Sequence, residues 1–142
     1  MSTILIVEDD ADTCEALIKL LERYGYSAQC AKNGWEALLA LDHHSIDLVL
    51  LDLRMPGMDG ETFLSILRND ARRKALPVIV LSASDTPDAR AKTDRLGVQD
   101  FLVKANYSFP QLLTVIRRHL PPPGNPQSRA SVSSKTASGP AN

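Results

Sequence analysis

The sequence has few of the features that would assign a protein of this size to a specialised class. Aromatic residues make up 5% of its 142 residues, and the formal net charge is −1. This near-neutral charge predicts no bulk electrostatic attraction to nucleic acid or membrane. No apolar stretch approaches the length needed to span a bilayer, and the N-terminus lacks the basic flank and long apolar region of a signal peptide. We therefore expect a cytoplasmic protein.

Cysteine is also scarce, since the chain has only Cys14 and Cys30. Their spacing matches neither a zinc motif nor a CxxC redox motif. Cys14 falls on the apolar stripe of an expected helix, which favours a small core residue. The two cysteines fit a reduced, cytoplasmic setting.

Apolar runs that alternate with helical patterns dominate what is present. Hydrophobic residues make up 44% of the chain, enough for the core of one domain. The expected strands are Ile4–Val7, Ser27–Cys30, Leu48–Leu51, Pro77–Leu81 and Gln99–Val103. The expected helices are Ala11–Arg23, Gly34–Asp42, Glu61–Asn69, Pro87–Leu96 and Phe109–Leu120. This pattern predicts an α/β fold with a five-stranded parallel sheet. For the strand order we adopt that of the known flavodoxin-like doubly wound (βα)5 arrangement, 2-1-3-4-5.

The composition changes at Pro121, which opens the helix-stopping sequence PPPG. The remaining residues are rich in Ser, Pro, Gly, Ala and Asn and include almost no large apolar side chain. Such a segment cannot bury enough surface to order itself. We expect one domain over residues 1–120 and a disordered tail or truncated linker over 121–142.

Polar side chains follow four of the five expected strands. They are Glu8-Asp9-Asp10, Asp52, Ser82 and Lys104. Ligands of open α/β sheets bind beyond the carboxyl ends of the strands, so these residues should share one edge. Carboxylates there can hold a divalent cation, and a hydroxyl and an ammonium can hold the oxygens of a phosphoryl group.

Residues 49–60, VLLDLRMPGMDG, resemble the phosphoacceptor segment of response-regulator receiver domains, the phosphorylated switches of two-component systems. The acidic cluster, Ser82 and Lys104 agree with that family, and the resemblance covers about residues 3–120. It implies that Asp52 accepts a phosphoryl group from a histidine kinase or phosphotransfer protein in a Mg²⁺-dependent phosphorelay. The protein would not be a classical enzyme, although it would catalyse its own phosphorylation and dephosphorylation.

The resemblance also implies the Mg²⁺ ligands. Asp10 and Asp52 would bind the ion directly, Asp9 would act largely through water, and the backbone carbonyl of Arg54 would complete the set. Glu8 could instead belong only to the solvated rim. Arg54 varies across the family and borders the site, so it could affect hydrolysis of the acyl phosphate.

Further roles implied by the family concern the switch. Lys104 would neutralise the phosphoryl oxygens, and Ser82 would bond to the acyl phosphate unless it simply caps the following helix. Phe101 would swing inward, changing the surface of the fourth helix, fifth strand and fifth helix for a downstream partner. The sequence leaves open whether the protein also forms a homodimer. The fourth helix has few large apolar residues and should be the least firmly held.

One position departs from the family pattern. A proline in a cis bond usually follows the site lysine, but here the sequence is Lys104-Ala105-Asn106. A non-proline cis bond costs about 2.5–4 kcal/mol. We expect either a trans bond or a strained cis bond.

Three other functions compete with this hypothesis. A receiver-like docking or dimerisation domain that never carries phosphate usually lacks an acid or the lysine. An Asp-nucleophile phosphohydrolase usually places a second Asp where Arg54 stands. A flavin-binding protein of similar fold would need a Ser/Thr-rich phosphate-binding loop after the first strand. The acids Glu8-Asp9-Asp10 at that place would repel the phosphate. DNA binding by this chain is not expected, because it has no helix-turn-helix pattern and no basic stripe.

Overall fold

The alternating strands and helices form one parallel sheet with helices on both faces, in a computed structural model that describes residues 2–55, 57–83, 86–104 and 106–120. The strands are β1 (Thr3–Val7), β2 (Ser27–Ala31), β3 (Leu48–Asp52), β4 (Val78–Ser82) and β5 (Asp100–Val103). The helices are α1 (Ala11–Arg23), α2 (Gly34–His43), α3 (Gly60–Arg68), α4 (Pro87–Arg95) and α5 (Phe109–His119). The tail over 121–142 and the Lys104–Ala105 bond lie outside the described residues.

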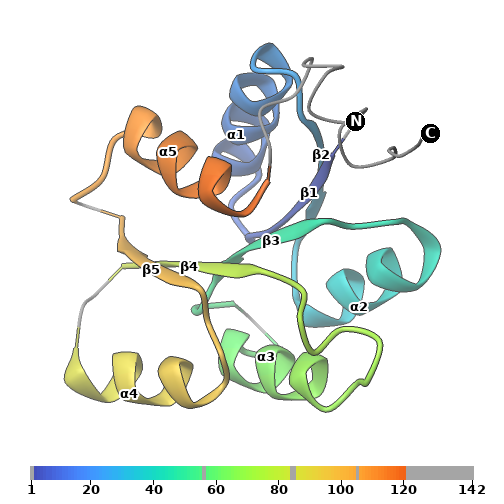
Figure 1. Cartoon of the computed structure of the whole chain (residues 1–142), viewed down its shortest axis with the longest axis vertical. Coiled ribbons are helices and arrows are strands. Elements are labelled where there is room, and N and C mark those ends of the chain that lie inside the picture. The colour runs from blue at the N-terminus through green and yellow to red at the C-terminus, as the bar shows by residue number, and fades with distance from the viewer. Residues whose placement is uncertain (1, 56, 84–85, 105, 121–142) are drawn as a thin grey trace, which may run out of the picture.

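The sheet has the order β2-β1-β3-β4-β5, which confirms the expected topology. All neighbouring strands are parallel, and Val7 pairs with Leu51 across β1 and β3. Figure 1 shows α1 and α5 on one face of the sheet and α2, α3 and α4 on the other. Consecutive strands are thus joined by helices, as parallel pairing requires.

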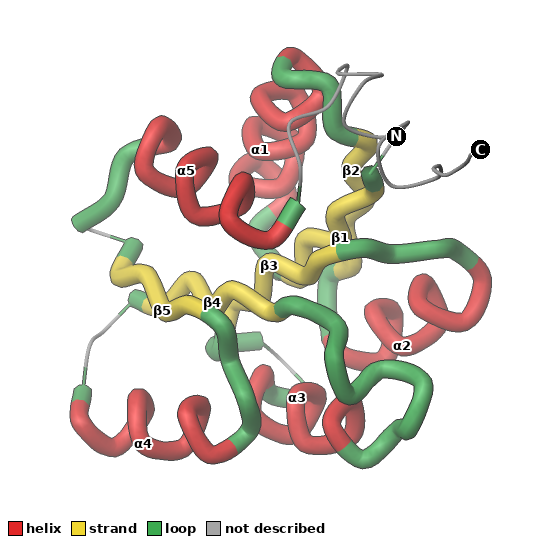
Figure 2. Tube along the Cα trace, in the orientation of Figure 1, coloured by secondary structure: helices red, strands yellow, loops and turns green. Residues whose placement is uncertain are grey.

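Side-chain alternation along the strands divides the core into two layers. Ile4 and Ile6 pack toward α1 and α5, whereas Leu5 and Val7 pack toward α2 and α3. Figure 2 shows the strands lying between these two groups of helices. Burying each such side chain contributes about 1.5–3 kcal/mol. The strands are therefore continuous apolar runs because both faces of the sheet are covered.

The helix starts follow the local sequence. Asn33 caps α2 by accepting a hydrogen bond from the Glu36 amide at 2.9 Å. Ser108 and Gln111 form a capping box at α5. Thr86, rather than Ser82, caps α4 by accepting from Ala89 N at 3.1 Å.

The element ends differ from the sequence-based bounds by a residue or two, and two of these shifts affect the site. β3 and β4 each continue one residue further than expected, so that they include Asp52 and Ser82. Asp52 pairs with Leu81, and Ser82 pairs with Val103. Both polar residues are therefore held by the sheet rather than by a loop. Over the described residues, no helix is long and apolar enough to cross a membrane.

Candidate functional site

The carboxyl edge of the sheet gathers three acidic side chains. Oxygens of Glu8, Asp9 and Asp52 all lie within 4.8 Å of one another. The β1–β3 register explains the approach, because Val7 pairs with Leu51 and the next residues, Glu8 and Asp52, then lie at the same level. Glu8 and Asp52 are buried, whereas Asp9 is exposed.

Lys104 connects two of these carboxylates. Its ammonium donates to Glu8 Oε1 at 2.8 Å and to Asp52 Oδ2 at 3.2 Å. Burial opposes the charged form of Lys104, but the hydrogen bond to Glu8 and the negative charges of Asp52 and Glu8 outweigh it, and the pKa of Lys104 is raised. Lys104 thus keeps its positive charge beside Asp52.

The loop after β3 holds the other oxygen of Asp52. The Arg54 amide donates to Asp52 Oδ1 at 3.1 Å. Gly60 begins α3 so close to this loop that an added Cβ would lie 2.7 Å from the Cα of Leu53 and 2.9 Å from the carbonyl oxygen of Asp52. Asp59 fixes the same helix start by accepting from the Thr62 amide at 2.8 Å. The turn residues of the motif therefore position Asp52.

Asp10 lies outside the carboxylate group. Its side chain accepts a hydrogen bond from the Thr13 hydroxyl, which lowers the pKa of Asp10. Its amide donates to Glu8 Oε2 at 3.2 Å. The family resemblance pointed to Asp9 and Asp10, but the structure brings Glu8 and Asp9 to Asp52. The pairing of β1 with β3 could have indicated this, because it places Glu8 level with Asp52. Asp10 is two residues further along the chain and is already the N-cap residue of α1.

Two shallow hollows lie at this edge of the sheet, and the first borders Asp9. One, of about 450 Å³, is lined by Asp9, Leu53, Arg54, Met55 and Asp59. The other, of about 210 Å³, is lined by Leu53, Arg54, Asp59, Glu61, Ser82 and Ala89. Three residues of the loop between β3 and α3 line both hollows: Leu53, Arg54 and Asp59. Ser82 is buried, and its carbonyl accepts from Lys104 N at 2.7 Å.

The donor set suits a hard divalent cation. Three acidic side chains lie against one ammonium here, and Mg²⁺ favours carboxylates together with water. The exposed Asp9 and the adjoining hollow leave room for solvent ligands. These residues therefore fit Mg²⁺.

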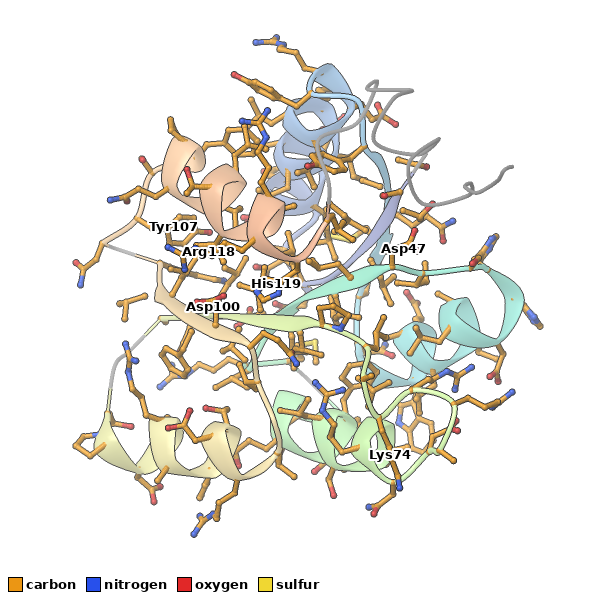
Figure 3. The ribbon with its side chains drawn as sticks, in the orientation of Figure 1. Asp47, Lys74, Asp100, Tyr107, Arg118 and His119 are labelled. Carbon is orange, nitrogen blue, oxygen red and sulfur yellow. A yellow bond between two sulfur atoms is a disulfide. The ribbon has the colours of Figure 1, made fainter. Side chains whose placement is uncertain are left out.

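A third hollow, of about 430 Å³, lies on the surface formed by α4, β5 and α5, and its lining includes Phe101, Tyr107 and Arg118. The half-buried Phe101 ring lies under Arg90, whose guanidinium carbon is 4.6 Å from the ring centroid. Figure 3 shows Arg118 and His119 beside Asp100. His119 Nε2 lies 2.9 Å from Asp100 Oδ2, which ties α5 to β5.

The structure also joins Cys14 and Cys30 in a disulfide, which the sequence did not predict. Cys14 is a buried core residue, as expected. The expectation of two reduced cysteines is corrected, because parallel pairing of β1 and β2 places Cys30 beside the first turns of α1. The 16-residue separation gave no motif by which to recognise the pair.

The sequence matches a known protein family and individual members of it. The response regulator receiver domain family matches residues 4–117. The chain is 35% identical over 131 residues to the sensory transduction protein RegX3 of Mycobacterium tuberculosis, covering 92% of this chain and 56% of that protein. It is 33% identical over 104 residues to protein PilH of Pseudomonas aeruginosa, covering 73% of this chain and 86% of that one. The chain thus spans little more than half of RegX3.

Solved structures with similar folds agree with this family match. The chemotaxis protein CheY4 of Vibrio cholerae superposes with a TM-score of 0.79 at 27% identity, covering 84% of this chain and 99% of that one. The response regulator TrrA of Thermotoga maritima, solved with Mg²⁺ and BeF, gives 0.74 at 30% identity, covering 84% and 100%. Sequence and structure together place this chain in the response-regulator receiver domain family of two-component signalling.

Proposed function

We propose that the protein is a phosphorylation-controlled switch whose phosphoacceptor is Asp52. The observation that carries this proposal is the contact of the buried Asp52 carboxylate with Lys104, beside Glu8 and Asp9. An ordinary turn-capping aspartate would not need a half-buried ammonium and two further acids beside it. A carboxylate is a competent nucleophile for phosphoryl transfer once its surroundings offset the charge.

In the proposed reaction, an Asp52 carboxylate oxygen attacks the phosphorus of a phosphohistidine on a partner kinase or phosphotransfer protein. A P–O bond forms as the P–N bond breaks, and the imidazole nitrogen takes the electron pair and then a proton. The product is an acyl phosphate. Lys104, 3.2 Å from Asp52 Oδ2, offsets the charge that gathers on the transferring oxygens.

Bound Mg²⁺ would neutralise phosphoryl oxygens and help to align the donor. Glu8, Asp9 and Asp52 would hold it in the arrangement observed here, together with the Arg54 carbonyl expected from the family. Asp10 is the alternative ligand that the sequence favoured. Water in the adjoining hollow would complete the coordination.

The output would follow from Ser82 and Phe101. Ser82 would bond to the acyl phosphate, and Phe101 would move inward, altering the surface formed by α4, β5 and α5 for a downstream protein partner. The hollow at Phe101 and the sparse burial of α4 support this part of the proposal. We propose a cytoplasmic protein that itself binds neither nucleic acid nor membrane.

The test is Mg²⁺-dependent labelling by a small acyl-phosphate donor, read on a phosphate-affinity gel. Native protein should shift only with Mg²⁺, and Asp52→Asn should not shift. Asp12→Asn, which makes the same change at an exposed residue of α1, should behave like native protein. No native shift, with Mg²⁺ binding and kinase transfer also absent, would favour a docking domain that carries no phosphate.

A further inference from the structure

The Cys14–Cys30 disulfide lies beside the acidic loop and is used by no step proposed above. It joins the second turn of α1 to the end of the edge strand β2, with Cα atoms 6.1 Å apart. The two sulfurs lie 3.4 Å and 3.8 Å from the backbone carbonyl oxygen of Glu8. Both sulfurs of the disulfide are therefore next to the backbone of Glu8, the first residue of the acidic cluster.

The two sulfurs differ in access. Cys14 is 4% exposed, whereas Cys30 belongs to the exposed residues of β2. Both border a groove of about 520 Å³ between α1 and β2. An attacking thiolate needs a clear approach to one sulfur, so Cys30 is the reachable end of the bond.

A short chain of contacts leads from the disulfide to the phosphoacceptor. The Glu8 carbonyl adjoins both sulfurs, and the Glu8 side chain accepts from Lys104 at 2.8 Å. Lys104 in turn donates to Asp52 at 3.2 Å. Reduction would remove the covalent link between α1 and β2 and give Cys14 a thiol proton that it can share with the Glu8 carbonyl. Both changes act on the position of Glu8.

We propose that Cys14–Cys30 is a thiol–disulfide exchange site, opened by a dithiol reductant at Cys30, whose redox state sets the affinity of the acidic cluster for a divalent cation. The reductant thiolate attacks Cys30 Sγ, and Cys14 leaves as a thiolate and takes a proton. The second reductant thiol then displaces Cys30, so two electrons and two protons pass to the protein and the reductant becomes a disulfide. Disulfides in reducing compartments are usually transient, as a sensor requires.

The direction of the effect follows from the cross-link. The disulfide limits the motion of the loop between β1 and α1, so the oxidised form loses less loop freedom when its carboxylates gather around a cation. The second half of the proposal rests on the proposed function, because it assumes that the cluster binds Mg²⁺. The first half, thiol–disulfide exchange at Cys30, does not depend on the proposed function.

The experiment uses the whole chain, oxidised or reduced with dithiothreitol, with thiols counted by alkylation and intact mass. A limited glutathione pulse on oxidised protein should place the mixed disulfide on Cys30. Calorimetry should show Mg²⁺ bound about fivefold more tightly by oxidised than by reduced protein. The control variant Cys14→Ala/Cys30→Ala should show one affinity, with or without dithiothreitol.

Glutathione on Cys14 alone, or a bond that resists dithiothreitol in the native protein, would overturn the exchange site. Equal Mg²⁺ affinities of the two redox forms would overturn the coupling while leaving Asp52 phosphorylation intact. If neither form bound Mg²⁺, the proposed function and the coupling would both fail, and the Cys30 adduct would still decide the exchange site.

Discussion

The Lys104 ammonium donates to Glu8 Oε1 at 2.8 Å, although the two residues are 96 positions apart in the chain. β1 lies between β2 and β3, and β5 is at the far edge of the sheet, so Lys104 reaches back across the carboxyl edge to make this contact. The pair places Glu8 among the site residues rather than on a solvated rim. It also supplies the first of four predictions.

Neutralising Glu8 should weaken Mg²⁺ binding more than neutralising Asp10. Glu8 belongs to the carboxylate group, whereas Asp10 is engaged with Thr13. Even an outer-shell partner of a metal ligand is worth roughly 10–100-fold in affinity, so Glu8→Gln should cost at least about tenfold. Calorimetric titration of Glu8→Gln and Asp10→Asn makes the comparison. A larger loss in Asp10→Asn would restore the ligand set that the sequence favoured.

Lys104 should contribute pH-dependent stability at the alkaline end. Its pKa in the folded protein is raised above the ordinary lysine value of 10.5, so the stabilisation is complete below about pH 10.5 and is lost as pH rises through the folded-state pKa. Urea unfolding from about pH 9 to about 12 should show native protein losing stability over this range. Lys104→Met, which cannot titrate there, should lose less. Parallel pH profiles for the two proteins would refute the assignment.

Gly60 should tolerate alanine less well than Gly57. A Cβ at Gly60 would meet the backbone of Asp52 and Leu53, and such overpacking costs about 1–3 kcal/mol. At Gly57 nothing lies within 4 Å, but φ is +77°, which costs alanine about 1–2 kcal/mol. Both variants should unfold at lower urea concentration. Gly60→Ala alone should also slow Asp52 phosphorylation, and a normal rate in that variant would show that the loop adapts without moving Asp52.

α4 should exchange its amide hydrogens faster than α1. Thr93 is the buried residue of α4, whereas α1 buries Cys14, Leu17 and Leu21. Helices with few buried apolar side chains open at low free-energy cost. Hydrogen–deuterium exchange read by mass spectrometry over the two helices tests this. Equal protection of α4 and α1 would argue against α4 as the moving part of the switch.

Much of the fold could be predicted because its signals are local and strong. Five apolar runs separated by amphipathic helices permit little besides a covered parallel sheet. Right-handed crossovers allow more than one strand order, so the order 2-1-3-4-5 came from the known flavodoxin-like arrangement and not from the sequence pattern. Asp52, Ser82 and Lys104 could be placed at one edge for the same reason, since each directly follows an apolar run. The strand ends were less certain, because hydrogen bonding rather than hydrophobicity carries β3 and β4 one residue further.

The sequence by itself therefore determined the sheet, its covered faces and the edge at which the polar residues meet. Tertiary structure alone decided which of Glu8 and Asp10 joins Asp52, because that depends on register and on where α1 begins. It also decided the Cys14–Cys30 bond. Cys14 and Cys30 meet only when β1 and β2 pair and α1 packs beside them. A local sequence pattern gives no information about such contacts between residues far apart in the chain.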